Sequence, residues 1–555
     1  MGPSSPHCRR SGHAVPHPAE AHARTASADP AARSAGTVQA FRRRRQTSPH
    51  SDRRRLPHRL SGCNAERHAQ RATVTQWCVK GGDHISGGAP PTGEWTTVEL
   101  TSTRQQLSEQ RARLALSTLG TVTEDRSGAT TATTFTDFDY DVAILGLGYV
   151  GLPTALAYRA AGHRIAGIDV SEQRVAAIRR GDVDLIPSDR VLLESHRDSD
   201  GLLLTTDLSA LRRAAAVIIC VPTPVSDDLS PQLGILHSAC MTAVTNAVTG
   251  QLIVLTSTTY VGCTEELVVQ PLRDRGMNPG EDVHVVFSPE RIDPGNVQFG
   301  HEAVPRVIGG VSPACAARAV DLLGSAVEQT HVVSSPGHAE MTKLLENTFR
   351  AVNIALANEF ADICRELDLD VSAVIDAAAT KPYGFMKFTP GPGVGGHCIP
   401  CDPHYLLWQL RRQRVAAPMI TQAMHEISHR PGRVVDRAKD LLAENGIPLS
   451  GARVLVVGVA YKPNVADARE SPAIEILQRF WSAGALSRYY DPLFPSVTLP
   501  DGHTLTSVPN PGANEPDIVV LHTLHRDIDL SWITPKTLVL DTTYGATDIA
   551  HRSVL

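Results

Sequence analysis

The sequence predicts an α/β protein in which two Rossmann-like, doubly wound domains are joined by a long central helix. Three observations predict this fold. A short apolar run, Asp141–Leu145, is followed by a glycine-rich turn and a helical stretch, Leu152–Ala161. Apolar residues then recur at helical spacing over Gly337–Leu367, and a second α/β unit begins at Arg453–Ala460. Strands that alternate with helices in this way indicate parallel sheets.

The 555 residues carry a net charge of −5, with 42% hydrophobic and 20% charged residues, which is typical of an ordinary globular protein. No apolar run approaches the roughly 18–20 residues needed to cross a bilayer. The first 75 residues hold 14 Arg and 4 acidic residues, so the remainder is acidic, whereas nucleic acid binding needs a basic surface. Ten irregularly placed cysteines do not indicate a secreted disulfide framework. We therefore expect a cytoplasmic protein with neither a nucleic acid nor a membrane partner.

Residues 1–137 are rich in Arg, His, Pro, Ser, Ala and Thr and show little apolar periodicity. Such a segment cannot bury enough surface to offset the entropy of the chain. Its basic runs, Arg42–Arg45 and Arg53–Arg55, are also compatible with a nucleic acid patch or a transit peptide. We expect a disordered extension, or translated sequence upstream of the true start.

Three ordered domains are expected after this extension, over residues 138–335, 336–447 and 448–555. The sheet of the first domain continues in a parallel pattern through five apolar runs: Arg164–Val170, Ala215–Val221, Leu252–Thr256, Val283–Phe287 and Arg306–Ile308. The middle domain is helical and contains a Gly/Pro-rich loop at residues 381–403. The last domain contains a helix at Pro472–Ala483 and further strands at Ser487–Tyr490, Asp517–His522 and Thr537–Asp541.

Gly146, Gly148 and Gly151 directly follow the first strand and open a helix. Glycines at this spacing allow a tight turn, close approach of the backbone to a pyrophosphate and close helix–sheet packing, and the helix N-terminus stabilises the anion. Asp169 closes the next strand, where a carboxylate can bind both ribose hydroxyls. Since a 2′-phosphate would meet a like charge there, the pattern favours NAD over NADP.

The second α/β unit has Gly458 after its first strand but no second glycine fingerprint. Asp491 closes the next strand of this unit and resembles a ribose-binding acid in position. We interpret it as a strand-end turn acid, so this unit need not hold a dinucleotide.

The loop Pro390–His404 is the most informative segment for chemistry. Glycines at 391, 393, 395 and 396 let the backbone approach a bulky ligand and supply unhindered N–H donors. Cys398 suits nucleophilic attack on a carbonyl if its neighbours hold it as a thiolate. Lys343 and Asn347 lie at i and i+4 of the central helix and share one face. That face either points a cation and an amide donor at this site or is simply solvated.

Two other interpretations of this loop stay open. Cys398 and Cys401 have a thiol-redox spacing, and together with His397 and His404 they imitate a zinc cluster. Structural zinc usually takes two separated pairs of ligands, and no second pair is evident in the sequence. A redox pair normally opens a helix of a thioredoxin-like unit, which is not predicted. We therefore favour a catalytic cysteine and no metal.

These segments together resemble the UDP-glucose/GDP-mannose dehydrogenase family over about residues 140–545. The matching motifs, in the family's order, are GLGYVGLP (146–153), CVPTP (220–224), STTY (257–260), FSPERIDPGN (287–296), EMTKLLENTFRAVNIALANE (340–359), TKPYGFMKFTPGPGVGGHCIPCDPHYL (380–406) and AYKPNVADARESPA (460–473). The fourth and sixth motifs look most like the branch that oxidises UDP-N-acetylhexosamines, especially the UDP-N-acetylglucosamine 6-dehydrogenases.

The resemblance implies a role for each matched residue. In catalysis, Cys398 would be the nucleophile, Lys343 and Asn347 would stabilise the oxyanion, Asp402 would order water and Lys343, and Glu290 would assist thioester hydrolysis. NAD would be bound by Gly146, Gly148, Tyr149, Val150, Gly151, Asp169, Arg174, Thr223, Thr258 and Arg469. The sugar nucleotide would be bound by Glu290, Arg291, Lys343, Asn347, Gly393, Gly395 and Lys462.

The implied reaction is a four-electron oxidation of a sugar C6 hydroxyl to a carboxylate, with two NAD⁺ per sugar, for a surface polysaccharide precursor. The resemblance also implies a homodimer formed through the central helix. Alternatives are a UDP-glucose or UDP-ManNAc 6-dehydrogenase, a two-electron Rossmann dehydrogenase in which Cys398 is structural, and a non-catalytic NAD-sensing or zinc-stabilised interaction protein. The chain departs from the family pattern at Val261, Cys263, Cys401, Pro463 and Ala466, and none of these departures removes a catalytic group.

Overall fold

The computed structural model describes residues 138–183, 185–291, 302–396 and 398–555. The extension expected over residues 1–137 lies outside the described residues. Within the described ranges, no helix combines the length and the apolar character needed to span a bilayer. The cysteines in these ranges are all free thiols.

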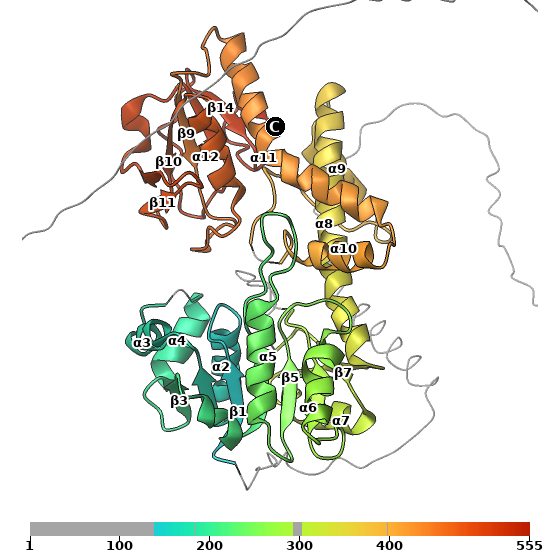
Figure 1. Cartoon of the computed structure of the whole chain (residues 1–555). Coiled ribbons are helices and arrows are strands. Elements are labelled where there is room, and N and C mark those ends of the chain that lie inside the picture. Colours follow the sequence, from blue (N-terminus) through green and yellow to red (C-terminus); the bar gives the residue numbers. More distant parts are fainter. Residues whose placement is uncertain (1–137, 184, 292–301, 397) are drawn as a thin grey trace, which may run out of the picture. The chain divides into compact units, whose positions relative to one another are not determined.

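Eight strands form the first sheet, in the order β3-β2-β1-β4-β5-β6-β7-β8 (Figure 1). Their bounds are β1 Tyr140–Leu145, β2 Ile165–Ile168, β3 Leu202–Thr205, β4 Ala214–Ile219, β5 Leu252–Leu255, β6 His284–Phe287, β7 Arg306–Gly310 and β8 Thr330–Val333. Neighbouring strands run parallel except for β6 and β7, which pair antiparallel. The order of the first six strands is that of a dinucleotide-binding Rossmann sheet.

The antiparallel pair corrects one expectation, because the sequence pattern predicted parallel strands through Arg306–Ile308. Parallel neighbours need a crossover connection, usually a helix. Among the described residues between β6 and β7, which are 288–291 and 302–305, there is no helix.

Helical elements cover both faces of this sheet. They are α2 Gly151–Ala160, α3 Glu172–Arg180, α4 Pro187–His196, η1 Leu208–Arg213, α5 Gly234–Asn246, η2 Glu265–Val269, α6 Gln270–Asp274 and α7 Pro313–Leu323. Successive strand residues point to opposite faces. Val142 and Ile144 of β1 belong to the core that includes α2 and α7, whereas Ala143 and Leu145 belong to the core that includes α5. Burial on both sides explains why the strands are continuous apolar runs rather than alternating ones.

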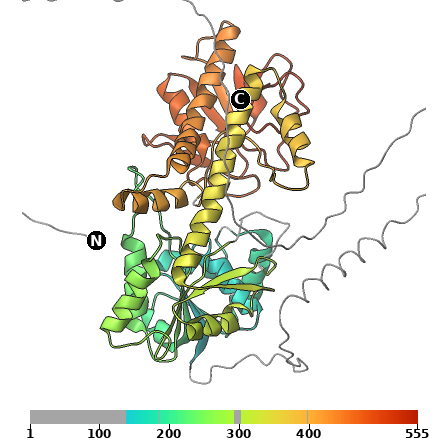
Figure 2. The ribbon, with the colours of Figure 1, turned by 90° about the vertical axis from the view of Figure 1, so that its right-hand side faces the viewer.

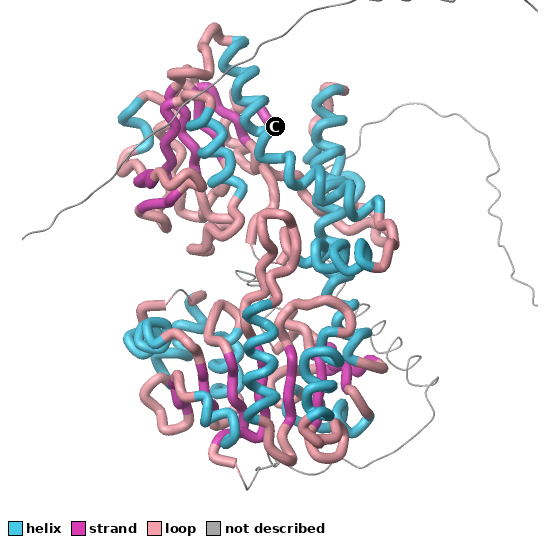
Figure 3. Tube along the Cα trace, in the orientation of Figure 1, coloured by secondary structure: helices cyan, strands magenta, loops and turns pink. Residues whose placement is uncertain are grey.

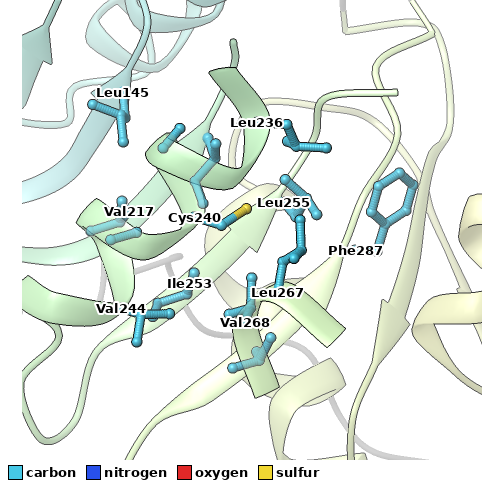
Figure 4. Packing of buried hydrophobic residues seen from close by; sticks show 14 of the residues in the cluster. Leu145, Val217, Leu236, Cys240, Val244, Ile253, Leu255, Leu267, Val268 and Phe287 are labelled. Atoms are coloured by element: carbon cyan, nitrogen blue, oxygen red, sulfur yellow. The ribbon is translucent and has the colours of Figure 1, made fainter. Parts of the chain in front are cut away.

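Figure 4 shows the core on the α5 side at close range. Apolar side chains of α5 pack in the same cluster as apolar side chains of β4, β5 and β6. The labelled members are Leu145, Val217, Leu236, Cys240, Val244, Ile253, Leu255, Leu267, Val268 and Phe287. This packing fixes the strand ends from which the site residues project.

A long helix, α8, spans the 31 residues Pro336–Glu366, close to the expected Gly337–Leu367. Ser335 caps its start by accepting a hydrogen bond from the His338 N–H, which satisfies one of the free donors of the first turn. The helix contacts β6, β7 and β8, and also α10 and α11 (Figure 2). The other helices of the middle segment are α9 Val371–Ala379, α10 Asp402–Arg412 and α11 Pro418–Glu444.

The second sheet contains five parallel strands in the order β10-β9-β13-β14-β15. Their bounds are β9 Arg453–Val457, β10 Leu486–Tyr490, β13 Ile518–Leu521, β14 Leu538–Asp541 and β15 Ser553–Val554, with α12 at Pro472–Ser482, η3 at Pro511–Asn514 and a small hairpin of β11 Ser496–Thr498 and β12 Thr504–Thr506. Residues of α11 and α12 share a core with one face of the sheet, and turn residues such as Leu524 and Trp532 cover the other. Figure 3 shows these strands (magenta) beside their helices (cyan). Two Rossmann-like sheets with a helical connection are thus confirmed.

The expected site residues of the first sheet all follow the carboxyl ends of its strands. Gly146 follows β1, Thr223 follows β4, Thr258 follows β5 and Glu290 follows β6. Ligands of open α/β sheets bind outside these strand ends, at the point where the strand order reverses. In this sheet that point lies between β1 and β4.

Candidate active site

The glycine turn after β1 is shaped by the protein on one side and is open on the other. A Cβ atom on Gly146 would lie 2.5 Å from the Cys220 carbonyl oxygen, and one on Gly151 would lie 1.8 Å from the Gly146 carbonyl oxygen. A Cβ atom on Gly148 would meet no atom within 4 Å, and Tyr149 and Val150 are exposed. The turn therefore leaves room for a pyrophosphate at the start of α2, as a dinucleotide requires.

Asp169, which follows β2, is tied to this turn. Its Oδ2 accepts a hydrogen bond from the Leu147 N–H (2.9 Å), and its Oδ1 accepts one from the Ser171 N–H (2.9 Å). Arg174 closes the arrangement by donating from Nε to the Leu147 carbonyl oxygen (2.9 Å). Asp169 remains only half-buried, so its carboxylate is oriented by the backbone and still accessible to a ribose.

Asp491 occupies the equivalent place in the second sheet, but its surroundings differ from those of Asp169. Its Oδ2 accepts from the Val459 N–H (2.7 Å) and its Oδ1 from the Leu493 N–H (2.8 Å), just as Asp169 bonds its own turn. However, Asp491 is buried, and the His525 Nε2 lies 3.2 Å from the same Oδ2. Burial alone would raise the pKa of Asp491, but His525 and the two amides hold it below the usual value. Both carboxylate oxygens of Asp491 are thus bonded within the protein, in agreement with its interpretation as a turn acid.

Lys343 and Asn347 both point from α8 into the candidate site. The Lys343 Nζ donates to the Glu290 carbonyl oxygen (2.6 Å), and the Asn347 Nδ2 donates to the Asp402 Oδ2. Lys343 is buried and Asn347 is half-buried. The pair does not form a solvated helix face.

Asp402 is the first residue of α10 and is buried. Its Oδ2 accepts hydrogen bonds from Asn347 and from the Thr258 Oγ1 (3.4 Å), whereas its Oδ1 has no hydrogen-bond partner among the described residues. Burial raises the pKa of Asp402 to about 6, against the lowering effects of the Lys343 charge and the bonds from Asn347 and Thr258. Asp402 is therefore a carboxylate that can change protonation near neutral pH.

Cys398 lies one turn before Asp402, whose N–H donates to the Cys398 carbonyl oxygen (2.9 Å). The cysteine is exposed, yet the dense protein around its sulfur and the Asp402 charge raise the thiol pKa above its usual value, although Lys343, Arg469 and Arg350 act in the opposite direction. The direction of this shift runs against the condition that the neighbours of Cys398 hold it as a thiolate. The physical reason is that Asp402 and desolvation together outweigh the three cations.

Cys401 and His404 differ from Cys398 in their surroundings. Cys401 is buried, and burial raises its pKa to about 12, which removes the low-pKa thiolate that disulfide exchange requires. Burial also lowers the pKa of His404. The described residues, which do not include His397, contain no group of three or more His, Cys, Asp or Glu side chains arranged around a metal position.

Glu290 is paired with an arginine that sequence reasoning missed. The Arg306 Nη1 lies 2.9 Å from the Glu290 Oε2, and both side chains are about 10% exposed. Arg306 also donates from Nε to the Ser288 Oγ (3.2 Å), and the Arg291 N–H donates to the Glu290 Oε1 (2.8 Å). Arg306 starts β7, next to β6 in the sheet, so only the strand order could have identified it.

Three glycines of the loop also make close contacts within the protein. A Cβ atom on Gly393 would lie 2.8 Å from Pro472, and one on Gly395 would lie 2.7 Å from the Glu470 carbonyl oxygen. A Cβ atom on Gly396 would lie 2.9 Å from the Tyr461 ring. A larger residue would not fit at these three positions, because the loop packs against the segment between β9 and α12.

A cavity of about 400 Å³ lies between this loop and the carboxyl ends of the second sheet. It is lined by Pro390, Gly391, Pro392, Gly393, Tyr461, Pro463, Pro472, His522, Thr523, Leu524, Thr543 and Gly545. The expected substrate residue Lys462 is half-buried and lies between two lining residues, Tyr461 and Pro463. A cavity of this size and position is suited to a nucleotide-sized ligand.

The remaining expected residues are distributed around these features. The Arg469 guanidinium lies 4.1 Å from the centre of the Tyr149 ring and bonds Asp467, so it joins the second α/β unit to the glycine turn. Thr223 is buried, and its carbonyl oxygen accepts from the Tyr405 hydroxyl (3.2 Å). Arg291 forms an ion pair with Glu346 of α8 (2.6 Å).

The fold and the glycine turn with its neighbour Asp169 place the protein in the class of NAD-dependent dehydrogenases. Sequence comparison narrows the class, and the chain belongs to the UDP-glucose/GDP-mannose dehydrogenase family. The family's NAD binding domain matches residues 140–326, its central domain residues 337–427 and its UDP binding domain residues 455–546. The proteins of this family are NAD-dependent nucleotide-sugar dehydrogenases.

Individual relatives agree with this assignment. The chain is 36% identical to the UDP-N-acetyl-D-mannosamine dehydrogenase of Escherichia coli strain K12 over 356 residues, which are 62% of this chain and 83% of that protein. Its fold matches the UDP-D-ManNAc dehydrogenase of Pyrococcus horikoshii with a TM-score of 0.66 and 31% identity, over 72% of this chain and 95% of the other. The UDP-glucose dehydrogenase of Pyrobaculum islandicum has the same fold, with a TM-score of 0.67, 24% identity and coverage of 78% and 98%.

Proposed function

We propose that this protein oxidises the C6 hydroxyl of a UDP-N-acetylhexosamine to the uronic acid, using Cys398 as a covalent nucleophile. The observation that carries the proposal is the convergence of four groups from three parts of the chain. Lys343 and Asn347 come from α8, Asp402 from the start of α10 and Cys398 from the preceding loop. Cys398 is close enough to Lys343 and Asp402 for both charges to act on its thiol, and all four groups would surround the reacting carbonyl carbon.

The identity of the sugar is the finer part of the proposal. UDP-ManNAc is supported by the names of the Escherichia coli and Pyrococcus horikoshii relatives, and UDP-GlcNAc by the motifs in the chain. Pro463 lines the cavity at a position where the resemblance leads us to expect a charged residue. We place UDP-ManNAc first because two separate comparisons support it.

We assign the two ligands to different parts of the chain. Residues 138–335 would hold NAD, with the glycine turn at the pyrophosphate and Asp169 and Arg174 at the adenosine ribose. Residues 448–555 would hold the UDP moiety at the cavity, with residues 336–447 supplying the groups that react. When bound, NAD⁺ supplies the hydride acceptor for each of the two oxidations of C6.

Cys398 would retain the sugar between the two oxidations. Its sulfur attacks the C6 aldehyde, a C–S bond forms and the aldehyde oxygen becomes a hydroxyl, giving a thiohemiacetal. The second oxidation converts this group to a thioester, which holds the intermediate in place for hydrolysis. Lys343 and Asn347 would donate hydrogen bonds to the C6 oxygen as negative charge develops on it.

The raised pKa of Cys398 means that its proton must leave as the C–S bond forms. We propose that Asp402 takes this proton from the thiol and passes it to the aldehyde oxygen, which becomes the hydroxyl of the thiohemiacetal, because its pKa of about 6 makes it a carboxylate at neutral pH and a competent base. Glu290 would assist the attack of water on the thioester. Its ion pair with Arg306 fixes the direction in which that carboxylate points.

A homodimer through α8 is also part of the proposal. Apolar side chains of α8 remain exposed along one stripe of the helix, including Leu345 (63%), Leu356 (48%) and Phe360 (45%). Contiguous exposed apolar side chains of this kind mark an interaction surface, and a two-fold dimer brings the same stripe of two copies together.

The decisive experiment counts NADH per sugar consumed. Purified protein is given NAD⁺ with UDP-ManNAc, UDP-GlcNAc, UDP-GalNAc or UDP-glucose, and NADH and uronate are measured. We expect two NADH per sugar with an N-acetylhexosamine, no uronate from Cys398→Ser and normal uronate from the control Cys401→Ala. One NADH per sugar would instead support a two-electron dehydrogenase, and normal turnover by Cys398→Ser would rule out covalent catalysis.

A further inference from the structure

Arg430 of α11 is fully buried, with 1% of its side chain exposed, and its three nitrogens bond three different parts of the protein. Nε donates to the Gly391 carbonyl oxygen (3.1 Å), Nη1 to the Asp362 Oδ1 of α8 (2.7 Å) and Nη2 to the Tyr544 hydroxyl (3.3 Å). A buried cation is stable only when it is paired and hydrogen-bonded, and Asp362 supplies the opposite charge. The other two bonds reach the loop that lines the cavity and a tyrosine that lies between two other lining residues.

The first wall is the loop segment Pro390–Gly393, all of which lines the cavity. The Gly391 peptide is fixed from both sides, because its N–H donates to the Asn358 Oδ1 of α8 (2.9 Å) while its carbonyl accepts from Arg430. The Gly391 N–H is therefore not left for a ligand, and its carbonyl oxygen already accepts one hydrogen bond. The bonds instead set the position of the loop that leads to Cys398.

The second wall includes Thr543 and Gly545, and Tyr544 lies between them. Tyr544 has a φ of +60°, a conformation that a bulky side chain rarely adopts and that persists only where its surroundings impose it. Its hydroxyl donates to the Leu555 carbonyl oxygen (2.6 Å) and accepts from Arg430. The strained residue is thus held by its side chain, and Arg430 is one of the two groups that hold it.

We propose that Arg430 is a positioning residue for the nucleotide-sugar site: one guanidinium bonds both walls of the cavity and sets their separation. Only an arginine suits this task, because its planar group directs donors in three fixed directions, whereas a lysine ammonium is a single point charge. The inference rests on the proposed occupancy of the cavity by the UDP moiety. None of the three partners of Arg430 belongs to the glycine turn, so NAD binding is expected to be independent of it.

The test compares the binding of UDP and of NAD⁺ to the full chain by titration calorimetry. Arg430→Met is expected to raise the Kd for UDP about tenfold or more, which corresponds to about 1.4 kcal/mol, and to leave the Kd for NAD⁺ unchanged. Arg430→Lys keeps the charge beside Asp362, and its Kd for UDP is expected to lie between those of the wild type and Arg430→Met. In turnover, the KM for the nucleotide sugar should rise far more than kcat falls.

Arg433→Met is the matched control. Arg433 lies one turn further along α11 and pairs with the same Asp362, but its other partner is the exposed-side Glu426 and not a cavity wall. We expect this variant to bind UDP as the wild type does. A similar loss of UDP affinity in both variants would show that Asp362, and not the two walls, is the relevant partner, and would overturn the proposal.

Two further variants decide the case if Arg430→Met does not fold. Tyr544→Phe removes the hydroxyl that Arg430 bonds at the second wall, and Asn358→Ala removes the acceptor on α8 that holds the Gly391 N–H of the first wall, while both retain Arg430. Each is expected to weaken UDP binding several-fold without affecting NAD⁺. Wild-type UDP affinity in both would overturn the positioning role alone, whereas failure of the wild type itself to bind UDP would overturn the proposed occupancy.

Discussion

The two oxygens of Asp402 have different surroundings, and this difference bears on how the site titrates. Oδ2 accepts hydrogen bonds from Asn347 and Thr258, whereas Oδ1 is buried and has no partner within the described residues. Its folded pKa of about 6 exceeds the ordinary 3.8. Asp402 therefore lowers the free energy of unfolding as the pH rises through about 6 and the folded carboxyl loses its proton. This loss of stability is absent below pH 3.8, where Asp402 is protonated in both the folded and the unfolded state.

Activity is predicted to fall as the pH drops through about 6, because protonated Asp402 can no longer receive the thiol proton. The measurement is the pH profile of kcat/KM for the nucleotide sugar. Asp402→Asn should remove this acid limb at a lower overall rate. Asn347→Ala should move the limb to higher pH, because the Asn347 bond lowers the Asp402 pKa. An unchanged limb in Asp402→Asn would assign it to another group.

The Cys398 thiol of the free protein is predicted to react slowly with iodoacetamide at pH 7, with a reaction midpoint above the ordinary 9.0. Mass spectrometry of the modified peptide gives the rate at each pH. Lys343→Met should raise the midpoint, since it removes a cation, and Asp402→Asn should lower it, since it removes a like charge. A wild-type midpoint below 9.0 would show that the thiol is activated without substrate. The buried Cys220 serves as an internal control.

Among the elements, the loop before α10 owes its shape to contacts that leave no room for a side chain. Gly395 and Gly391 both have ordinary φ values, yet a Cβ atom on Gly395 would lie 2.7 Å from backbone and one on Gly391 would meet nothing within 4 Å. Two glycines four residues apart therefore differ only in their surroundings.

Gly395→Ala is predicted to destabilise the protein by about 1–3 kcal/mol, the usual cost of overpacking, and Gly391→Ala to leave stability unchanged. Thermal unfolding followed by circular dichroism measures both. We expect a melting temperature several degrees lower for the first variant only. Equal melting temperatures for the two variants would mean that the loop yields without cost.

The strands that the sequence predicted well are those whose side chains are mostly buried. The runs that became β1, β5 and β9 are apolar segments that are covered on both faces of their sheet. Helix α8 was predictable because apolar residues recur at helical spacing along its 31 residues. The sequence did not predict β8, whose residues Thr330–Val333 are partly exposed, or the three-residue strands of the hairpin β11–β12. Such short, half-solvated strands are fixed by their neighbours rather than by their own composition.

The same distinction applies to the candidate site. Lys343 and Asn347 could be paired from sequence because helical spacing puts them on one face. Arg306 and Arg430 could not, because Glu290 and Gly391 meet them only after strands and helices have packed. The raised pKa of Cys398 was missed for a related reason, since desolvation depends on packing and is not encoded in residue spacing.

At the scale of the whole molecule, the two sheets share one hydrogen-bonded turn arrangement. In each, the residue after the first glycine donates its N–H to the acid that closes the next strand, as in Leu147 with Asp169 and Val459 with Asp491. The copies differ in that Asp491 is buried and bonded by His525. In the first sheet the acid remains accessible to a ligand, and in the second it is part of the protein interior.

A second feature at this scale is the exposed apolar stripe of α8. Leu356→Glu is predicted to convert a dimer to a monomer, because a charge buried without a partner opposes association. Light scattering after gel filtration measures the mass. Val191→Glu is the matched control, since Val191 is also exposed (64%) but lies on α4, and it should remain dimeric. A wild-type protein that is already monomeric would contradict the proposed interface.

The His525 side chain has a practical consequence for protein engineering. It bonds the Asp491 Oδ2, whose counterpart in the first sheet, the Asp169 Oδ2, accepts a hydrogen bond from the Leu147 N–H. Anyone wishing to install a second nucleotide cofactor in this scaffold would begin by truncating that imidazole. The strand, the glycine and the acid that such a graft requires are already in place.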